Sequence, residues 1–298
     1  MIDLPNVTLI IAETRAHELG RLAVEACLAK ARFADVLIYT DRPELIQVPG
    51  ARYLAMPNWP DKVQAGRFYY TEAMRPVQTS HALLIEWDGG INDPVMWRDE
   101  FLAYDYIGAP WPMQPASHNV GNGGFLLMSK RLADHVYSHK DRMKITTDCD
   151  ISVRFRGAME AAGFVWAPAN VANDFSFEGW RRGPTKLALA PKSFGYHGAF
   201  NWPVILDREE LIARARVAMQ TDFVVKTGKW AGTAGIATAA PWLHDLLGTA
   251  AYRRPIPVRP RPTPQLQPPP QSQTPAYARR RPMTIQQQRE LQLRGLKA

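Results

Sequence analysis

A short apolar segment that ends in two acidic residues and two glycines constrains the fold of this chain more than any other feature. Residues 82–90 read Ala-Leu-Leu-Ile-Glu-Trp-Asp-Gly-Gly. Continuous apolar runs of this kind are typical of strands in a sheet covered on both faces, and ligands bind in the crevice beyond the carboxyl ends of such strands. Asp88 therefore lies either in a ligand-binding crevice or in a solvated turn, since Asp-Gly is also a common turn dipeptide.

The segments that precede this run predict an α/β fold. Residues 7–12 and 35–40 have the composition of strands, and the apolar residues of 16–31 between them recur at helical spacing. This strand-helix-strand order predicts a parallel sheet. Neither a Gly-x-Gly-x-x-Gly sequence nor a P-loop follows the first strand, so the common dinucleotide and NTP fingerprints are absent. The same patterns predict three more helices, over residues 61–79, 150–162 and 208–219, and one more strand over 125–128.

The positive charge of the chain is concentrated at its C-terminus. The whole chain carries +8, whereas the residues from Tyr252 onward contain ten Lys or Arg and one acid, Glu290, a net +9 that leaves −1 for residues 1–251. Ten of the 25 prolines also lie there, and such a composition cannot bury enough apolar surface to form a core. We therefore expect a folded domain over residues 1–222, a helical extension over 223–251 and a disordered Pro/Arg-rich tail over 252–298.

The tail and the cysteine content limit the partners and the compartment. We expect at most weak contact of the tail with an anionic membrane or an acidic protein. Specific nucleic-acid binding is not expected, because the arginines alternate with prolines and only Tyr277 is aromatic after Tyr252 at the start of the tail. Cys27 and Cys149 form no scaffold pattern, and neither a signal peptide nor a run of 18 apolar residues is found. These features predict a cytoplasmic protein, with a peripheral position at the inner face of a membrane as the alternative.

Three further segments combine residues that suit a binding site, and each has a structural alternative. Residues 104–111, Tyr-Asp-Tyr-Ile-Gly-Ala-Pro-Trp, suit either a wall against a flat ligand or a core corner. Residues 119–125 contain three glycines before a strand, where the backbone could approach a ligand or form a tight turn. Thr147-Asp148-Cys149-Asp150 precedes a helix, so an acid there could serve as a general base or as a helix cap, the latter for Asp150 above all.

Taken in order, these segments resemble the DUF5672 family, whose members look like glycosyltransferases. The resemblance continues through Gly-Phe-Val-Trp-Ala-Pro at 163–168, Ala-Asn-Asp-Phe-Ser-Phe-Glu at 172–178 and Phe-Gly-Tyr-His-Gly at 194–198. It extends from about Leu4 to about Trp202 and leaves the tail outside. The resemblance implies a GT-A-like fold, in which a mixed, mainly parallel sheet flanked by helices binds a nucleotide, and makes residues 1–222 the catalytic domain.

The resemblance also implies a metal site. In GT-A-like folds a short motif containing Asp holds a divalent cation that bridges the diphosphate of a sugar nucleotide, and here that motif is Glu86-Trp87-Asp88. Mn²⁺ or Mg²⁺ suits this role, because hard cations prefer carboxylate and phosphate oxygens. We expect Asp88 as the first ligand, with Glu86, where the family usually has Gln, as a second. His197 is placed in sequence to complete the shell, although a lone histidine is more often structural.

The resemblance implies Asp148 as the catalytic base. The family usually shows Glu-Asp where this chain has Thr147-Asp148. In an inverting transfer, a carboxylate takes the proton of the acceptor hydroxyl during attack at the anomeric carbon. The absence of the neighbouring Glu leaves open a weakened or inactive member of the family.

The remaining candidates concern the donor. Thr14 and Arg15 follow the first strand, where Arg15 could pair with phosphate. Tyr69, next to Tyr70, could stack on a nucleobase, and core packing is the alternative. Two sets of residues could face the donor, the glycine cluster Gly121, Asn122, Gly123 and Gly124 and the sugar-stacking tryptophans Trp97, Trp111 and Trp180. Core burial is equally expected for each tryptophan.

These features predict a metal-dependent glycosyltransferase that moves a sugar from a nucleotide-sugar donor to a glycan, lipid-linked or protein acceptor. Two alternatives stay open: a non-catalytic nucleotide- or sugar-binding protein of the same fold, and an anionic-partner binder that acts through its basic tail. The donor base and sugar, the acceptor and the oligomeric state have no signal in the sequence.

Overall fold

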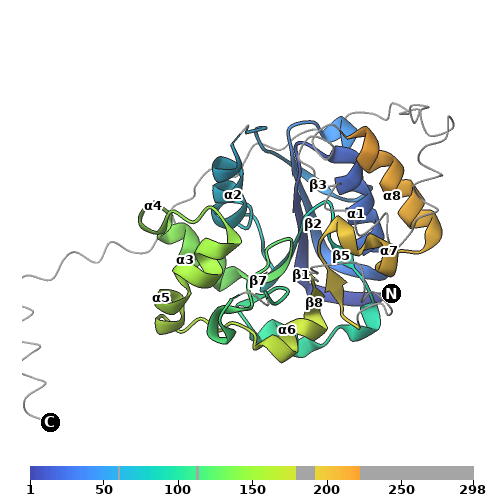
Figure 1. The fold of residues 1–298 in the computed structure, drawn as a ribbon. Coiled ribbons are helices and arrows are strands. Elements are labelled where there is room, and N and C mark those ends of the chain that lie inside the picture. The colour runs from blue at the N-terminus through green and yellow to red at the C-terminus, as the bar shows by residue number, and fades with distance from the viewer. Residues whose placement is uncertain (60, 112–113, 179–191, 222–298) are drawn as a thin grey trace, which may run out of the picture.

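A six-stranded mixed sheet forms the centre of the molecule, with helices on both faces (Figure 1). The computed structural model describes residues 1–59, 61–111, 114–178 and 192–221. The strand order is β3-β2-β1-β4-β7-β6. These strands span Ile2–Ala12 (β1), Ala31–Thr40 (β2), Arg52–Ala55 (β3), His81–Ile85 (β4), Tyr106–Ile107 (β6) and Phe125–Ser129 (β7). The first four are parallel, and β7 is antiparallel to both β4 and β6, which confirms a mixed, mainly parallel sheet.

Strand β4 is buried along its whole length, as its apolar run predicts. Its alternate side chains enter two separate cores: Leu83 and Ile85 pack on one face of the sheet and Leu84 on the other. Helix α1 (His17–Lys30) contributes Val24 to the first core, and α3 (Lys130–Ser138) contributes Leu132 to the second. Figure 1 shows these helices on opposite sides of the sheet. The strand therefore has no solvated face, and only its ends can carry function.

Two predicted helices differ from the observed ones. Helix α2 covers Lys62–Thr71 instead of 61–79, because the chain turns after Thr71 and Pro76 cannot continue a helix. The predicted helix at 150–162 is divided into a π-helical turn, Asp150–Arg154, and α5, Arg156–Ala161. The division follows from an i→i+5 hydrogen bond in which the Phe155 N–H donates to the Asp150 carbonyl over 2.9 Å.

The other predicted helices are confirmed to within one residue at their ends. Helix α1 spans His17–Lys30, and α8 spans Arg208–Gln220. The start of α8 is fixed by the Asp207 side chain, which accepts a hydrogen bond from the Glu210 N–H over 2.8 Å. The remaining helices are α4 (Lys140–Met143), α6 (Ala169–Phe175) and α7 (Trp202–Ile205), with 3-10 turns at Pro43–Leu45, Pro94–Met96, Asp99–Ala103, Ala116–His118 and Ala199–Asn201.

A second, three-stranded sheet brings distant parts of the chain beside the end of β4. It consists of β5 (Gly90–Ile91), β9 (Gly195–Tyr196) and β8 (Ser176–Phe177), in the order β5-β9-β8. Strand β5 begins two residues after Asp88, and β9 ends one residue before His197. This small sheet therefore determines which residues meet at the carboxyl edge of the large one.

The expected boundaries at residues 222 and 251, the helical extension and the tail lie outside the described part of the chain. Within the part that is described, no helix is both long and apolar enough to cross a bilayer.

Candidate metal centre

The carboxyl ends of β1 and β4 lie side by side at the point where the strand order reverses. From β1 the chain proceeds to β2 and β3 on one side, and then returns to place β4 on the other side of β1. At such a switch point the connections leave in opposite directions and open a crevice in which ligands bind. Strand β1 ends at Ala12 and β4 at Ile85. The residues that follow them, Thr14 and Arg15 on one side and Glu86 on the other, therefore lie at this edge of the sheet.

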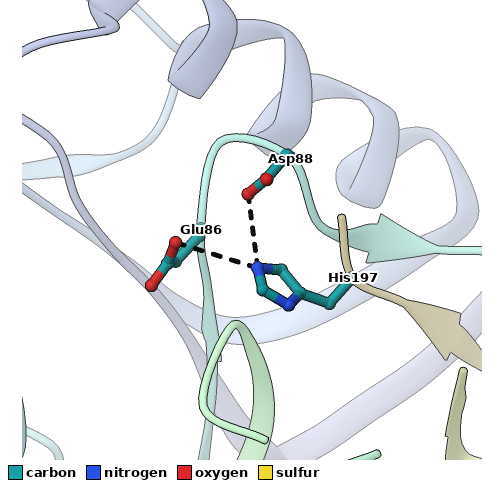
Figure 2. A group of neighbouring side chains, drawn as sticks. All are labelled: Glu86, Asp88 and His197. Carbon is teal, nitrogen blue, oxygen red and sulfur yellow. Dashed lines mark ion pairs between the residues drawn. The ribbon is translucent and has the colours of Figure 1, made fainter. Parts of the chain in front are cut away.

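The tripeptide after β4 belongs to a tight turn that begins where the strand ends. Trp87 is buried and packs edge-on against Trp202, with 5.9 Å between the ring centroids. Glu86 and Asp88, on either side of it, both turn toward His197 (Figure 2). The Glu86 N–H donates to the Gly124 carbonyl over 2.9 Å, and the Gly89 N–H donates back to the Glu86 carbonyl over 3.0 Å. This tight turn thus places both carboxylates on the side of His197.

Glu86, Asp88 and His197 form a cluster whose ligand atoms all lie within 4.8 Å of one another. The His197 Nε2 is 3.4 Å from the Asp88 Oδ1 and 3.8 Å from the Glu86 Oε2 (Figure 2). The Asp88 side chain is 8% exposed and that of Glu86 is 43% exposed. The cluster is therefore closed on the side of Asp88 and open on the side of Glu86.

The chemistry of this cluster fits a divalent cation. The Asp88 Oδ1 and the His197 Nε2 are both buried and have no hydrogen-bond partner. Their 3.4 Å separation is an ion-pair distance, but the geometry does not make a hydrogen bond. Buried polar atoms without partners are costly and rare in folded proteins. Two carboxylates and an imidazole match the donors of a divalent metal such as Mn²⁺, so a cation among these atoms would satisfy both.

The electrostatics of the site favour a positive charge at the same place. Burial lowers the pKa of His197, but the carboxylates of Asp88, Glu178 and Glu86 outweigh burial and raise that pKa well above its ordinary value. Three acidic side chains therefore surround one ring. A metal ion would compensate the same excess of negative charge.

Glu178 belongs to the site and was not predicted as a site residue. Its Oε1 lies 3.1 Å from the His197 Nδ1, and its Oε2 accepts hydrogen bonds from the Asn122 Nδ2 over 2.7 Å and the Trp111 Nε1 over 3.3 Å. The only sequence signal for it is an acid at the end of the Ala-Asn-Asp-Phe-Ser-Phe-Glu block. Trp111 and Asn122 are thus brought to the site, through a carboxylate that sequence reasoning missed.

The glycines of the cluster make room for neighbouring side chains. A Cβ on Gly121 would lie 2.3 Å from the Trp111 ring, one on Gly123 would lie 2.0 Å from the Tyr70 hydroxyl, and one on Gly124 would lie 2.1 Å from the His197 Nε2. The Gly124 N–H donates to the Asn122 Oδ1 over 3.1 Å. Close packing of neighbouring side chains accounts for the lack of a side chain at these three positions.

Asp148 lies against the same glycine segment. Its Oδ2 accepts a hydrogen bond from the Gly123 N–H over 3.2 Å and its Oδ1 one from the Cys149 N–H over 2.9 Å. Burial raises the pKa of Asp148, and the nearby charge of Glu86 raises it further against the lowering effect of these hydrogen bonds. A partly buried carboxylate with a raised pKa is a candidate proton acceptor.

Asp150 has a structural role, but not that of the helix cap that the sequence predicts, because its side chain bonds to residues that precede it. Its Oδ2 accepts hydrogen bonds from the backbone N–H of Thr146 and of Thr147, over 2.9 and 3.1 Å. The Thr147 Oγ1 in turn accepts from the Asp150 N–H over 3.2 Å. This local network holds the loop that carries Asp148.

The candidates for donor binding lie around the same edge of the sheet. The Tyr69 hydroxyl donates to the Gly123 carbonyl over 3.4 Å, and its ring packs edge-on against Tyr70 at 5.1 Å. Burial raises the Tyr69 pKa well above its ordinary value. Thr14 is buried and donates to the Asn58 Oδ1 over 3.4 Å. The backbone N–H of Arg15, which is only partly buried, donates to the carboxylate of Glu13 over 2.6 Å.

Other candidates lie apart from this edge. Trp97 packs against Phe101 and Phe194 in an aromatic cluster of the core, at 5.6 and 5.0 Å between ring centroids. His81 occupies the first position of β4, at the opposite end of the strand from Glu86 and Asp88, and its Nε2 is 3.1 Å from the Tyr104 carbonyl. Trp180 lies outside the described residues.

Comparison with known families adds one finding. A model of the family described as "Protein of unknown function (DUF5672)" matches residues 65–197, which confirms the resemblance over that segment. The segment begins in α2 and ends at His197, so it contains the candidate metal ligands and Asp148. No curated protein matches the chain.

Proposed function

We propose that this chain, whose residues 65–197 match the DUF5672 family, is a metal-dependent glycosyltransferase with a GT-A-like fold. It would move a sugar from a nucleotide-diphosphate donor to a glycan, lipid-linked or protein acceptor in the cytoplasm. The observation that supports this most is the convergence of Glu86, Asp88 and His197 at the carboxyl edge, with two buried ligand atoms that lack partners.

The metal ligands have different surroundings, which suits a shared role with substrate. Asp88 and His197 are almost enclosed, whereas the Glu86 carboxylate is 43% exposed. A divalent cation held by these residues would neutralise negative charge on the leaving diphosphate. Because the cluster is open on the side of Glu86, substrate oxygens could complete the shell there.

Asp148 would act as the base. Its raised pKa favours proton uptake relative to an ordinary aspartate, while the Gly123 N–H holds its Oδ2 in position. As the acceptor oxygen bonds to the anomeric carbon, its proton would pass to Asp148 and the bond to the diphosphate would break. Tyr69 hydrogen-bonds to the same glycine segment and forms a neighbouring part of the wall.

One observation favours the second function, a nucleotide- or sugar-binding protein without transfer activity. Thr147 stands where the family usually has Glu, and its hydroxyl is occupied by the Asp150 N–H. If the missing Glu were the base, the chain would bind a donor and not transfer its sugar. Slow hydrolysis of the donor that Asp148→Asn leaves unchanged would support this version.

Calorimetry tests the proposal. The full chain is titrated with UDP and GDP, and with their common sugar conjugates, in the presence and absence of Mn²⁺. We expect metal-dependent binding of one nucleotide class, lost in Asp88→Ala, and release of nucleoside diphosphate that depends on Asp148. Binding that Asp88→Ala retains at full strength, or no binding of any of these nucleotides, would contradict the proposal.

A further inference from the structure

We propose that Glu178 is a positioning residue that fixes the ring of His197 with Nε2 toward Asp88 and Glu86. The inference rests on the proposed metal site, because its consequence is the direction in which the ring presents its free nitrogen. The Glu178 Oε1 lies 3.1 Å from the His197 Nδ1, on the side of the ring away from the two candidate carboxylate ligands.

The hydrogen-bond chemistry allows one assignment for the Nδ1 proton. A carboxylate only accepts, so the contact between Glu178 and His197 requires a proton on Nδ1. The Asn122 Nδ2 also lies 3.1 Å from this nitrogen. Asn122 cannot be turned over to offer its oxygen, because its Oδ1 accepts from the Gly124 N–H over 3.1 Å. One of its two amide hydrogens is donated to the Glu178 Oε2 at 2.7 Å. A bare Nδ1 would place its lone pair against the carboxylate Oε1 of Glu178 at 3.1 Å, so Nδ1 keeps its own proton.

The ring has little freedom to adopt another orientation. The ring lies directly over Gly124, where even a Cβ atom would come within 2.1 Å of its Nε2. The backbone on both sides is also held: the His197 N–H donates to the Phe177 carbonyl over 3.0 Å, and the His197 carbonyl accepts from the Asn201 Nδ2 over 2.7 Å. With Nδ1 protonated and bound, the lone pair of a neutral ring must be on Nε2.

Glu178 is itself held in place by neighbouring side chains. Its side chain is 10% exposed, and its other oxygen accepts from Asn122 and from the Trp111 Nε1. A carboxylate that accepts the second N–H of a metal-binding histidine sets the tautomer and increases the basicity of the ring. Such a carboxylate generally contributes about 10–100-fold to metal affinity.

Glu178→Gln is the decisive variant, because it keeps the shape of the side chain. The amide must present an N–H group either to the His197 Nδ1 or to the Asn122 and Trp111 donors, so one contact is lost in either orientation. Glu209→Gln, an exposed residue in the first turn of α8, is the matched control. All three proteins are compared as full chains with matched far-UV circular dichroism.

Two readouts are taken. Titration with Mn²⁺ alone should give a Kd about 10–100-fold weaker for Glu178→Gln than for the wild type, and an unchanged Kd for Glu209→Gln. In the metal-free protein, the hydrogen-bonded Nδ1–H resonance of His197, assigned by its loss in His197→Gln, should shift upfield or disappear in Glu178→Gln.

The readouts separate this inference from the proposed function. An unchanged Nδ1–H resonance in Glu178→Gln overturns the inference, whether or not Mn²⁺ binds. A wild type that binds no Mn²⁺ contradicts the proposed metal site, and the resonance alone then decides the role of Glu178. Equal Mn²⁺ affinity in Glu178→Gln and the wild type also overturns the inference.

Discussion

The absence of a side chain at Gly124 leaves the space that the ring of His197 occupies. The ring occupies the space that a Cβ atom on Gly124 would need, with its Nε2 2.1 Å from that position. Gly124 also precedes the strand whose residues pair with β4, so its backbone has little freedom to move away. At this position, a residue without a side chain is a condition for the candidate metal centre.

Gly124→Ala should therefore displace the ring and weaken Mn²⁺ binding by at least about tenfold. Overpacking of this kind should also destabilise the fold by about 1–3 kcal/mol. Calorimetry and urea unfolding measure the two effects. Gly157→Ala is the control, because a Cβ there meets nothing within 4 Å and a helical alanine is favoured over glycine. Equal Mn²⁺ affinity in Gly124→Ala and Gly157→Ala would contradict the prediction.

The ionised carboxylate of Asp148 should lower the free energy of unfolding at neutral pH. Burial raises its pKa above the ordinary 3.8, so the folded chain holds the proton more tightly than the unfolded chain does. The stability that this group contributes is complete below pH 3.8 and is lost as the pH rises through the folded-state pKa. Asp148→Asn should therefore unfold at a higher urea concentration than the wild type at pH 7, and the difference should narrow as the pH falls toward 4.

Asp150→Asn provides a control of opposite sign. Burial tends to raise the pKa of Asp150, but its hydrogen bonds from Thr146 and Thr147 outweigh burial and lower it. Its stabilising effect is thus present at neutral pH and is lost on acidification, so this variant should be less stable than the wild type at pH 7. If both variants changed stability in the same direction at pH 7, the assignment for Asp148 would be wrong.

At the scale of elements, one buried carboxylate joins the edge strand β6 to helix α3. Asp105 is 2% exposed and precedes β6 directly. It accepts hydrogen bonds from the Ser129 hydroxyl over 2.5 Å, from the Val165 N–H over 2.8 Å and from the Arg131 guanidinium. The Tyr-Asp-Tyr-Ile-Gly-Ala-Pro-Trp segment therefore owes its acid to the fold rather than to the candidate site.

Asp105→Ala should destabilise the fold by about 3 kcal/mol, because the hydrogen bonds from Ser129, Val165 and Arg131 to a charged carboxylate are lost and buried donors are left unpaired. The change in unfolding free energy can be measured with urea at pH 7. Asp134→Ala, which removes an exposed carboxylate paired with Lys130 on α3, should cost less than about 0.5 kcal/mol. Comparable losses in the two variants would refute the role given to Asp105.

The elements that the sequence predicts correctly are those with a continuous apolar run or a helical period. Leu9 to Ile11 and Leu83 to Ile85 alternate between two cores, and the α1 pattern repeats on one face. The π-helical turn at Asp150–Arg154 has no comparable signal, because it depends on a hydrogen bond that spans one residue more than an α-helix allows. Short strands of two residues, such as β8 and β9, arise from tertiary pairing and leave no period at all.

At the scale of the whole molecule, the sequence predicts the site residues that lie in one motif. It misses the residue that only strand pairing brings to the site. Glu86 and Asp88 follow a buried strand, and that pattern points to the carboxyl edge. Glu178 reaches the site only because β8 pairs with β9, which places its carboxylate beside His197. No spacing along the chain reports such a contact, because it depends on a sheet of two-residue strands.

The small sheet has a thermodynamic consequence for the whole chain. Asp88 follows a strand of the large sheet and His197 a strand of the small one, so an ion bound by both would act as a removable cross-link between them. Such an ion binds only the folded chain. At a free-ion concentration 100 times Kd, its binding adds about 2.7 kcal/mol to the free energy of unfolding. The Tm should therefore rise with Mn²⁺ concentration, return after chelation, and stay constant in Asp88→Ala.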